Sequence, residues 1–310
     1  MKKRILLEGI ILLVIAGIAH AQQVADLEYK PPIAQPAYEA GKGPCVAIDE
    51  AHHNYHTAEA RYKPFAELLR RDGYRVDGLN RPFSANSLKD IDVLVIANAL
   101  NERNIEDWSL PTPSAFMKDE ISAIRSWIEK GGSVFLIADH MPFPGAANDL
   151  AKALGVEFSN GFAVLKSAGT STTFAFAPGS GLGESMITQG RGGPERVTKV
   201  VTFTGSAFRP PRPAIPVLAF NEDYMSLMPD VAWRFTAATP RKSLEGWCQG
   251  AIMKIEKGRV AVFGEAAMFS AQLAGPKKQK SGMNAPGAEQ NHQLLLNVMH
   301  WLTRVKGIRD

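Results

Sequence analysis

Two continuous apolar runs constrain the fold of this 310-residue chain more than any other feature. They are Val93 to Ala97 (VLVIA) and Val134 to Ala138 (VFLIA). A strand with one face in water alternates apolar and polar residues, whereas an uninterrupted apolar run is typical of a strand covered on both faces. Between them, Lys118 to Lys130 has isoleucines at helical spacing and ends at a Gly-Gly pair, which predicts a helix. This order predicts a parallel sheet between layers of helices.

The same alternation extends over most of the chain after residue 44. Further predicted strands are Cys45–Ile48, Tyr74–Val76, Ala251–Ile255 and Val260–Phe263, and further predicted helices are 64–72, 146–154 and 290–305. Right-handed crossovers between such strands place helices on both faces of the sheet. Residues 156–245 lose the rhythm and are predicted to form an irregular β-rich insertion. Its strand-like pieces are Thr170–Phe176, Val197–Phe203 and Pro216–Ala219.

The first 21 residues have the pattern of a bacterial signal peptide. Three basic residues, Lys2 to Arg4, precede an apolar core at Ile10–Ile18, and Ala19-His20-Ala21 places small residues where a signal peptidase cuts. An uncleaved anchor is the alternative, but this stretch is shorter than the ~20 apolar residues that span a bilayer. We therefore expect a periplasmic or secreted protein, cleaved after Ala21, with no stable membrane insertion. Residues 22–44 are rich in proline and glycine and predict an extended lead-in.

Motifs and charge exclude several functions. Asp49-Glu50-Ala51-His52 spells a helicase tetrapeptide, but the only Gly-Lys pair, Gly41-Lys42, lacks the earlier glycine of a phosphate-binding loop. The Gly-x-Ser-x-Gly motif of serine hydrolases is also absent. The net charge of +4 includes the basic residues of the signal region, so no nucleic-acid partner is expected. Cys45 and Cys248 either pair in an oxidising compartment or remain two free thiols.

Polar side chains follow several of the predicted strands. Ligands of open parallel sheets bind outside the carboxyl ends of the strands, so these side chains are expected to converge. They are Asp49, Glu50, His52, His53 and His56 after the first strand, Asn98 and Asn101 after VLVIA, Asp139 and His140 after VFLIA, and Glu265 after Val260–Phe263. Imidazole and carboxylate groups are usual ligands of zinc and of other hydrolytic metals. Three interpretations remain open: a metal site, a metal-free polar pocket, and purely structural contacts.

A role can be assigned to each residue if this edge is a functional site. The catalytic carboxylates would be Asp49, Asp139 and Glu265. The ligands of a divalent metal such as zinc would be His52, His56 and His140, and a metal-bound water would supply hydroxide for hydrolysis. The residues contacting a bound molecule would be Glu50, His53, Asn98 and Asn101. Residues 274–289 follow the Glu265 segment and would form a flap over the crevice.

The order of these segments resembles a known family. The succession VAIDEAH, DVLVIANAL, GGSVFLIADH, KGRVAVFGEAAMFSAQ and NHQLLLNVMHWL is similar to exported bacterial proteins with a class I glutamine-amidotransferase-like domain, including trehalose-utilisation-type proteins. The resemblance covers most of the mature chain. It implies an α/β, flavodoxin-like three-layer sandwich with a mostly parallel sheet, formed by residues 45–310 as a single domain.

The resemblance breaks at the catalytic residues. Amidotransferases place a cysteine nucleophile after the strand that corresponds to VFLIA, and a His–Glu pair near the C-terminus. This chain has Ala138-Asp139-His140 at that turn, and only Glu265 matches the pair, which argues against glutamine hydrolysis through a thiolate. One hypothesis is a hydrolase-like pocket for a small polar ligand, of carbohydrate type by family association. The other is a non-catalytic binding or scaffold module.

Overall fold

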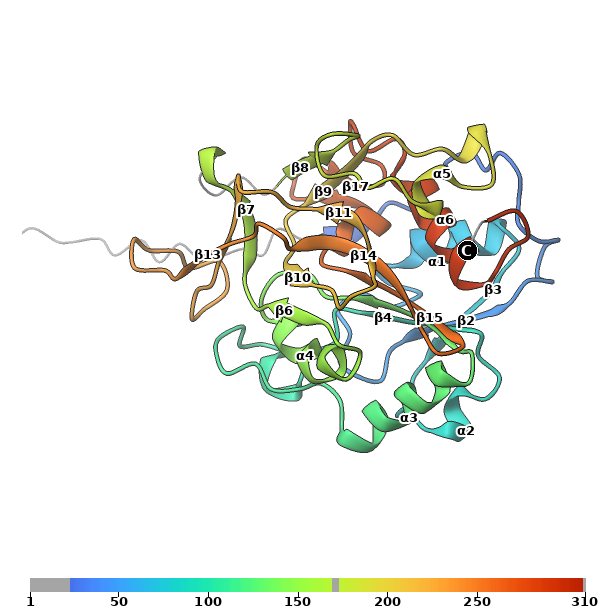
Figure 1. The fold of residues 1–310 in the computed structure, drawn as a ribbon, viewed down its shortest axis with the longest axis horizontal. Helices are drawn as coiled ribbons and strands as arrows, with labels where there is room; N and C mark the ends of the chain where they lie inside the picture. The colour runs from blue at the N-terminus through green and yellow to red at the C-terminus, as the bar shows by residue number, and fades with distance from the viewer. Residues whose placement is uncertain (1–22, 169–172, 309–310) are drawn as a thin grey trace, which may run out of the picture.

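A large mixed sheet forms the centre of the protein in the computed structural model, which describes residues 23–168 and 173–308 (Figure 1). Its strands are β2 (Cys45–Asp49), β3 (Arg75–Leu79), β4 (Val93–Ala97), β5 (Ser133–Ile137), β6 (Glu157–Ser159), β10 (Ala207–Arg209), β11 (Ile215–Ala219), β14 (Cys248–Ile255) and β15 (Gly258–Phe263). The strand order is β3-β2-β4-β5-β15-β14-β10-β6, with β11 also paired to β14. The predicted signal peptide and the start of the predicted strand Thr170–Phe176 lie outside the described residues.

The sheet has a parallel half and an antiparallel half. The strands β3, β2, β4, β5 and β15 pair in parallel, and β14, β10, β6 and β11 extend the sheet in antiparallel pairings. Because β2 lies between β3 and β4, the chain leaves β2 in one direction along the sheet and later returns past it in the other. Such a reversal opens a crevice above the carboxyl ends of the two strands at which it occurs.

Helices cover both faces of the sheet, as the two apolar runs predict. The helices α1 (Lys63–Arg71) and α6 (Asn291–Leu302) lie on one face, and α2 (Ala85–Leu88), α3 (Lys118–Glu129) and α4 (Phe143–Ala153) lie on the other (Figure 1). One hydrophobic cluster joins α1 and α6 to Val95 and Ile137, and a second joins α3 and α4 to Ile96 and Leu136. Neighbouring residues of a strand point to opposite faces. The predicted α/β architecture is therefore confirmed.

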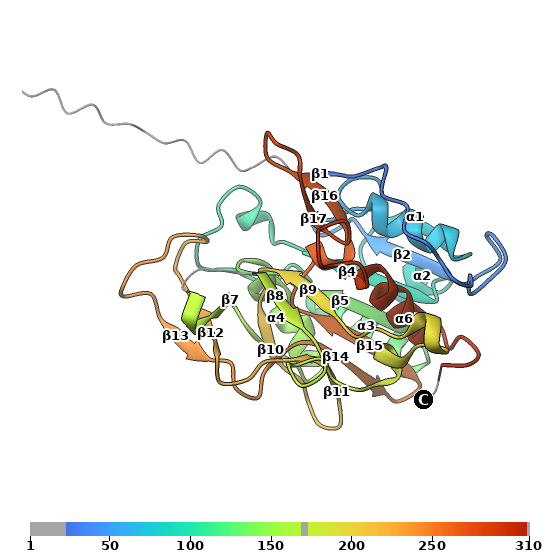
Figure 2. The same cartoon turned by 90° about the horizontal axis from the view of Figure 1, so that it is seen from above.

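Smaller antiparallel sheets flank the central one. The first joins β1 (Gln23–Ala25), β16 (Ala271–Ala274) and β17 (Gln279–Gly282); the second joins β7 (Phe162–Leu165), β12 (Tyr224–Leu227) and β13 (Arg241–Ser243); the third joins β8 (Thr173–Phe176) and β9 (Val200–Phe203). Figure 2 shows the first two at different sides of the molecule. The proposed flap thus begins as a hairpin paired with the lead-in. Residues 156–245 are also more integrated than predicted, since β6, β10 and β11 belong to the central sheet.

The cysteines do not form a disulfide. Cys45 begins β2 and Cys248 begins β14, and both are free thiols. The sheet order separates these strands by four spacings, roughly 19 Å in total at about 4.8 Å per strand. A disulfide requires Cα atoms within about 7 Å of each other.

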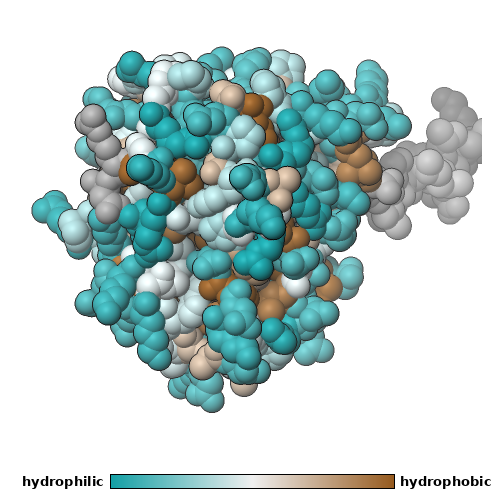
Figure 3. Space-filling model, turned by 90° about the vertical axis from the view of Figure 1, so that its right-hand side faces the viewer, coloured by the Kyte–Doolittle hydropathy of each residue, from teal (hydrophilic) through white to brown (hydrophobic). Residues whose placement is uncertain are grey.

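No helix between residues 23 and 168 or between 173 and 308 is both long and apolar enough to cross a bilayer. The side of the molecule nearest α1, α6 and the C-terminus is mostly hydrophilic, with only small hydrophobic areas (Figure 3).

Gly73, at the end of α1, allows a close approach between two segments. Its φ is 98°, and an added Cβ would lie 2.4 Å from the carbonyl oxygen of Tyr38. We expect Gly73→Ala to lower the free energy of unfolding by about 2–4 kcal/mol, from the left-handed backbone and the backbone clash together. Gly41→Ala is the matched control, because Gly41 has a φ of 68° and no atom within 4 Å of an added Cβ. Urea unfolding that gave equal losses for the two variants would contradict the steric explanation.

Candidate functional site

A cavity of about 780 Å³ opens at the carboxyl ends of β2, β4, β5 and β15. The residues that follow these four strands and line it are His56, Asn98, Asp139, His140 and Glu265. Its volume lies within the range of about 300–1,000 Å³ that is usual for small-molecule sites. It occupies the crevice beside the reversal in strand order, where open parallel sheets bind their ligands.

Asn98 connects three walls of this cavity. It is the first residue after β4 and has a φ of 52°, a left-handed conformation that asparagine tolerates better than most residues. Its side-chain Oδ1 accepts a hydrogen bond from the backbone N–H of Asp139 at 2.9 Å. Its Nδ2 lies 3.2 Å from Nδ1 of His56. The ends of β4 and β5 are thereby fixed to the loop that follows β2.

His56 is a neutral, buried imidazole. Burial, with a smaller contribution from the positive charge of Arg61, lowers its pKa to about 3. Its ring lies 4.5 Å from the ring of Tyr62, measured between centroids. Its Nε2 has no hydrogen-bond partner among the described residues. A buried polar atom without a partner at the wall of a cavity is a candidate for contact with a ligand.

His140 is held by an aromatic surround. Its Nδ1 donates to the carbonyl oxygen of Met141 at 2.7 Å, and its ring stacks on Phe162 with centroids 4.6 Å apart. The ring of Trp233 meets it edge-on at 4.7 Å. Burial lowers the pKa of His140, so this imidazole is also neutral near pH 7.

Two carboxyl groups lie at the cavity wall beside these imidazoles. Asp139 Oδ1 accepts from the backbone N–H of His140 at 2.7 Å, and Oδ2 lies 3.4 Å from the N–H of Ala266. Glu265 is fully buried, and its two oxygens accept from the N–H groups of Ala267 and Met268. Burial and the charge of Asp139 raise the pKa of Glu265 well above its usual value, although these backbone N–H groups oppose the shift. The surroundings therefore favour the protonated form of Glu265, because two neighbouring buried carboxyl groups ionise together only at high cost.

Aromatic side chains form much of the remaining wall. Tyr55, Trp108, Phe143 and Trp233 line the cavity, and the side chain of Trp233 is 48% exposed. The loop after β4 is attached to the loop after β12 by two backbone hydrogen bonds, from Leu110 N–H to Asp230 O and from Ala232 N–H to Trp108 O. These aromatic residues were absent from the sequence-based site. Tyr55, Trp108 and Trp233 lie in irregular loops and Phe143 begins α4, and nothing local marks the four as neighbours.

Asp49 and His52 do not join this cavity. His52 Nδ1 lies 2.8 Å from Asp49 Oδ1, and Nε2 lies 2.9 Å from Glu120 Oε1, so both ring nitrogens have carboxylate partners. Burial lowers the pKa of His52, but hydrogen bonds and charges from Asp49 and Glu120 outweigh it and leave the pKa raised. Glu120 belongs to the first turn of α3. We call this group the Asp49–His52–Glu120 cluster. It links the end of β2 to α3.

Three other predicted ligand-binding residues serve the loops around the site. Glu50 Oε1 accepts from the N–H of Ala58 at 2.9 Å. His53 is exposed and has a φ of 48°. Asn101 accepts from the N–H of Arg103 and donates to the carbonyl oxygen of Ser114. None of the three is among the residues lining the cavity.

The predicted metal ligands do not assemble into one site. His52 uses both ring nitrogens within its own cluster, while His56 and His140 line the cavity. In the described ranges, no group of three histidine, cysteine, aspartate or glutamate side chains is arranged to hold a metal ion. The described residues therefore do not fit the predicted zinc-type centre.

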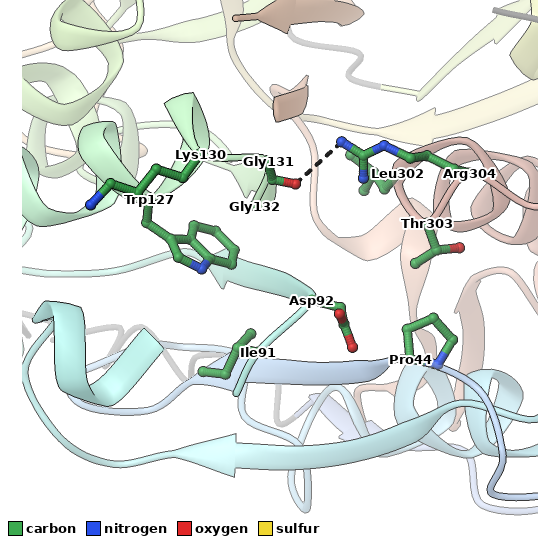
Figure 4. A pocket seen from close by; sticks show the side chains of 10 residues that line it. All are labelled: Pro44, Ile91, Asp92, Trp127, Lys130, Gly131, Gly132, Leu302, Thr303 and Arg304. Atoms are coloured by element: carbon green, nitrogen blue, oxygen red, sulfur yellow. Dashed lines mark hydrogen bonds between the residues drawn. The ribbon is translucent and has the colours of Figure 1, made fainter. Parts of the chain in front are cut away.

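A second cavity, of about 260 Å³, lies at the opposite edge of the sheet (Figure 4). It is lined by residues that precede β2, β4 and β5, and by the end of α6. Two of its charged side chains already have partners: Asp92 Oδ2 accepts from the N–H of Cys45, and Arg304 donates to the carbonyl oxygens of Gly131 and Lys257. This cavity is therefore a less suitable ligand site than the cavity at the carboxyl edge.

Comparison with known proteins supports the fold. No protein-family model matches the chain, and no curated protein does. Among solved structures, the mmIFT52 N-terminal domain aligns with a TM-score of 0.57 at 14% identity, over 84% of this chain and 97% of that one. A ThuA-like protein from Bacteroides uniformis aligns with a TM-score of 0.48 at 12% identity, over 86% of this chain and 94% of that one. At 14% identity the likeness to the mmIFT52 N-terminal domain concerns the fold alone.

Proposed function

We propose that the cavity at the carboxyl edge is the active site of an exported hydrolase that acts on a small, uncharged polar ligand of carbohydrate type. The observation that carries this proposal is the buried carboxyl pair Asp139–Glu265 at the cavity wall, where burial and the charge of Asp139 raise the pKa of Glu265 well above its usual value. Groups with strongly shifted pKa values in a cavity are candidates for acid–base chemistry. The exported location rests on the signal-peptide pattern of residues 1–21.

The composition of the cavity wall supports the ligand class. Aromatic rings supply apolar faces, while the carboxyl and imidazole groups supply hydrogen-bonding atoms. The charged residues that line the cavity are Glu106, Asp107, Asp139, Arg234 and Glu265. Because acidic groups predominate and both imidazoles are neutral, an anionic ligand is disfavoured. A sugar combines apolar ring faces with uncharged hydroxyl groups, and fits this wall.

The carboxyl pair can supply both proton transfers of a hydrolysis. Asp139 would accept a proton from a water molecule while the water oxygen bonds to the reacting carbon. Glu265 would donate its proton to the leaving oxygen as the bond between that oxygen and the carbon breaks. One water is consumed, and the pair again holds one proton afterwards. General acid–base catalysis of this kind contributes about 10²–10⁴-fold to a rate.

A non-catalytic binding module is the second candidate. It is favoured by the turn after β5, which carries Asp139 and His140 where the amidotransferases that the sequence resembles carry a nucleophilic cysteine. In that case the cavity would bind the same class of ligand and release it unchanged. Mass spectrometry of a bound saccharide after prolonged incubation separates the two candidates, because only hydrolysis adds the mass of one water across its products.

Ligand binding is tested with glucose, maltose and cellobiose, and with glucuronic acid and glucose 6-phosphate as charged comparators. We expect a neutral saccharide to raise the melting temperature and to quench tryptophan fluorescence, and the charged comparators to bind less tightly. Trp233→Ala should weaken binding about 3- to 10-fold through loss of an aromatic contact. Trp127→Ala is the matched control, because Trp127 lines the other cavity. The proposal fails if no neutral saccharide binds, or if both variants weaken binding equally.

A further inference from the structure

We infer that Asn98 is a positioning residue that fixes the tautomer of His56, so that the residues of the cavity wall include one imidazole N–H donor and one imidazole acceptor. The consequence for ligand recognition rests on the proposed function, whereas the tautomer itself follows from hydrogen bonds within the protein. This assignment makes Asn98 a determinant of specificity rather than a group that contacts the reacting atoms.

The first step is the orientation of the Asn98 amide. A backbone N–H is only a donor, so the Asn98 atom 2.9 Å from the nitrogen of Asp139 must be the oxygen. The NH₂ group must then face His56, at 3.2 Å from Nδ1. The Asn98 side chain is buried, and its left-handed backbone holds it at the junction of the two strand ends.

The second step is the state of the His56 ring. An NH₂ group can only donate, so His56 Nδ1 must be the acceptor. The ring is neutral, and its single proton therefore lies on Nε2. That N–H has no partner among the described residues. Leaving a buried donor unpaired is costly, so this N–H is the group of His56 that an acceptor on a ligand would satisfy.

The tautomer of His140 is the opposite one, with the proton on Nδ1. The carbonyl oxygen of Met141 is only an acceptor, so Nδ1 of His140 carries the proton and Nε2 keeps a lone pair. Two residues of the cavity wall therefore carry opposite tautomers, with a donor Nε2–H in His56 and an acceptor Nε2 in His140. A hydroxyl group can satisfy either one. A carboxylate or phosphate oxygen can satisfy only the donor, and an ammonium group only the acceptor.

The test replaces the Asn98 amide with an isosteric carboxylate. In Asn98→Asp, the oxygen facing His56 accepts rather than donates, so the proton should move to Nδ1 and the ring should titrate at a much higher pH. Long-range ¹H–¹⁵N NMR of protein labelled at histidine nitrogens reports both changes. In the wild type, we expect a protonated Nε2, an unprotonated Nδ1 and no titration of His56 above about pH 4.

Asn101→Asp is the matched control, since Asn101 follows the same strand and its side chain contacts no imidazole. It should leave the His56 spectrum unchanged. Asn98→Gly provides a second variant if Asn98→Asp folds poorly, because glycine accepts the left-handed backbone and removes the donor. This variant should give a mixture of the two tautomers. A wild-type ring protonated on Nδ1, or a tautomer that persists in both Asn98 variants, would overturn the inference.

The NMR experiment needs no ligand, so it separates this inference from the proposed function. Failure of every saccharide to bind a protein that shows the expected His56 tautomer would contradict the proposed function and leave the role of Asn98 standing. The reverse result, saccharide binding with the opposite tautomer, would overturn the role of Asn98 alone.

Discussion

Replacing His52 with alanine is expected to lower the free energy of unfolding by about 3–5 kcal/mol, the usual cost of removing one partner from a buried ionic group. The variant leaves Asp49 and Glu120 buried without the imidazolium between them. Glu120 would keep two backbone donors, the N–H groups of Phe83 and Met117. The remaining bond to Asp49, from the N–H of Ala51, measures 3.2 Å. Chemical denaturation at pH 6 measures the loss.

The loss of unfolding free energy in His52→Ala should depend on pH in a defined direction. The pKa of His52 is raised in the folded state, so its contribution is fully present below about pH 6.5 and is lost as the pH rises through the folded value. Hydrogen bonds from Met117, Phe83 and His52 outweigh burial and lower the pKa of Glu120. Its contribution is therefore present above about pH 4.5 and is lost as the pH falls through the folded value. The His52→Ala penalty should be largest between these limits.

His53→Asn is the control for this experiment. His53 is the next residue in the chain, is exposed, and has a left-handed backbone that asparagine also accepts. Its replacement should change the stability little at any pH. A His52→Ala penalty no larger than that of the control, or one that grows steadily above pH 8, would show that the Asp49–His52–Glu120 cluster does not act as an ionic link.

Asp139→Asn should produce two opposite effects, a more stable protein and a less active one. The asparagine can still accept from the N–H of His140 through Oδ1, but the negative charge beside Glu265 is gone. We expect turnover to fall by about 10²–10⁴-fold, as for loss of a general base. We also expect a gain of about 1–2 kcal/mol at pH 8, within the range found when a functional site is relieved of unfavourable charge.

The sign of the stability change in Asp139→Asn follows from the raised pKa of Glu265. Its pKa is raised in the folded state, so its contribution is fully present below its usual value of about 4.5 and is lost as the pH rises through the folded value. Removal of the Asp139 charge should reduce this loss, so the variant should gain more at pH 8 than at pH 5. Asp107→Asn, an exposed carboxylate at the same cavity, is the control. Equal melting temperatures for wild type and Asp139→Asn at pH 8, or undiminished turnover, would contradict the assigned pairing.

Periodicity in the sequence was sufficient to predict the parallel part of the fold. VLVIA corresponds to β4 residue for residue, and VFLIA is offset by one residue from β5. A strand buried on both faces leaves a local signature that needs no knowledge of the rest of the chain. The convergence of Asn98, Asp139 and Glu265 has the same origin, since adjacent parallel strands end at the same edge.

The parts that could not be predicted depend on contacts between distant segments. His52 and His56 lie four residues apart in one loop. Glu120 of α3 nevertheless contacts the ring of His52, whereas Asn98 contacts the ring of His56. The sequence of the loop does not predict the partner of either histidine, because each partner is a side chain more than forty residues away. The aromatic wall also depends on distant contacts, since Trp108 and Trp233 both reach the ring of His140 from two irregular loops that are attached to each other.

The pairing of β1 with β16 has a practical consequence for handling the protein. Gln23, the first residue of β1, lines the cavity at the carboxyl edge, so an affinity tag fused directly ahead of it would begin at the mouth of the candidate site. The end of α6 lies beside the other cavity, at the opposite edge of the sheet (Figure 4). Immobilisation through a tag at the C-terminal end therefore keeps the candidate site open to ligands, and is the preferred arrangement for binding assays.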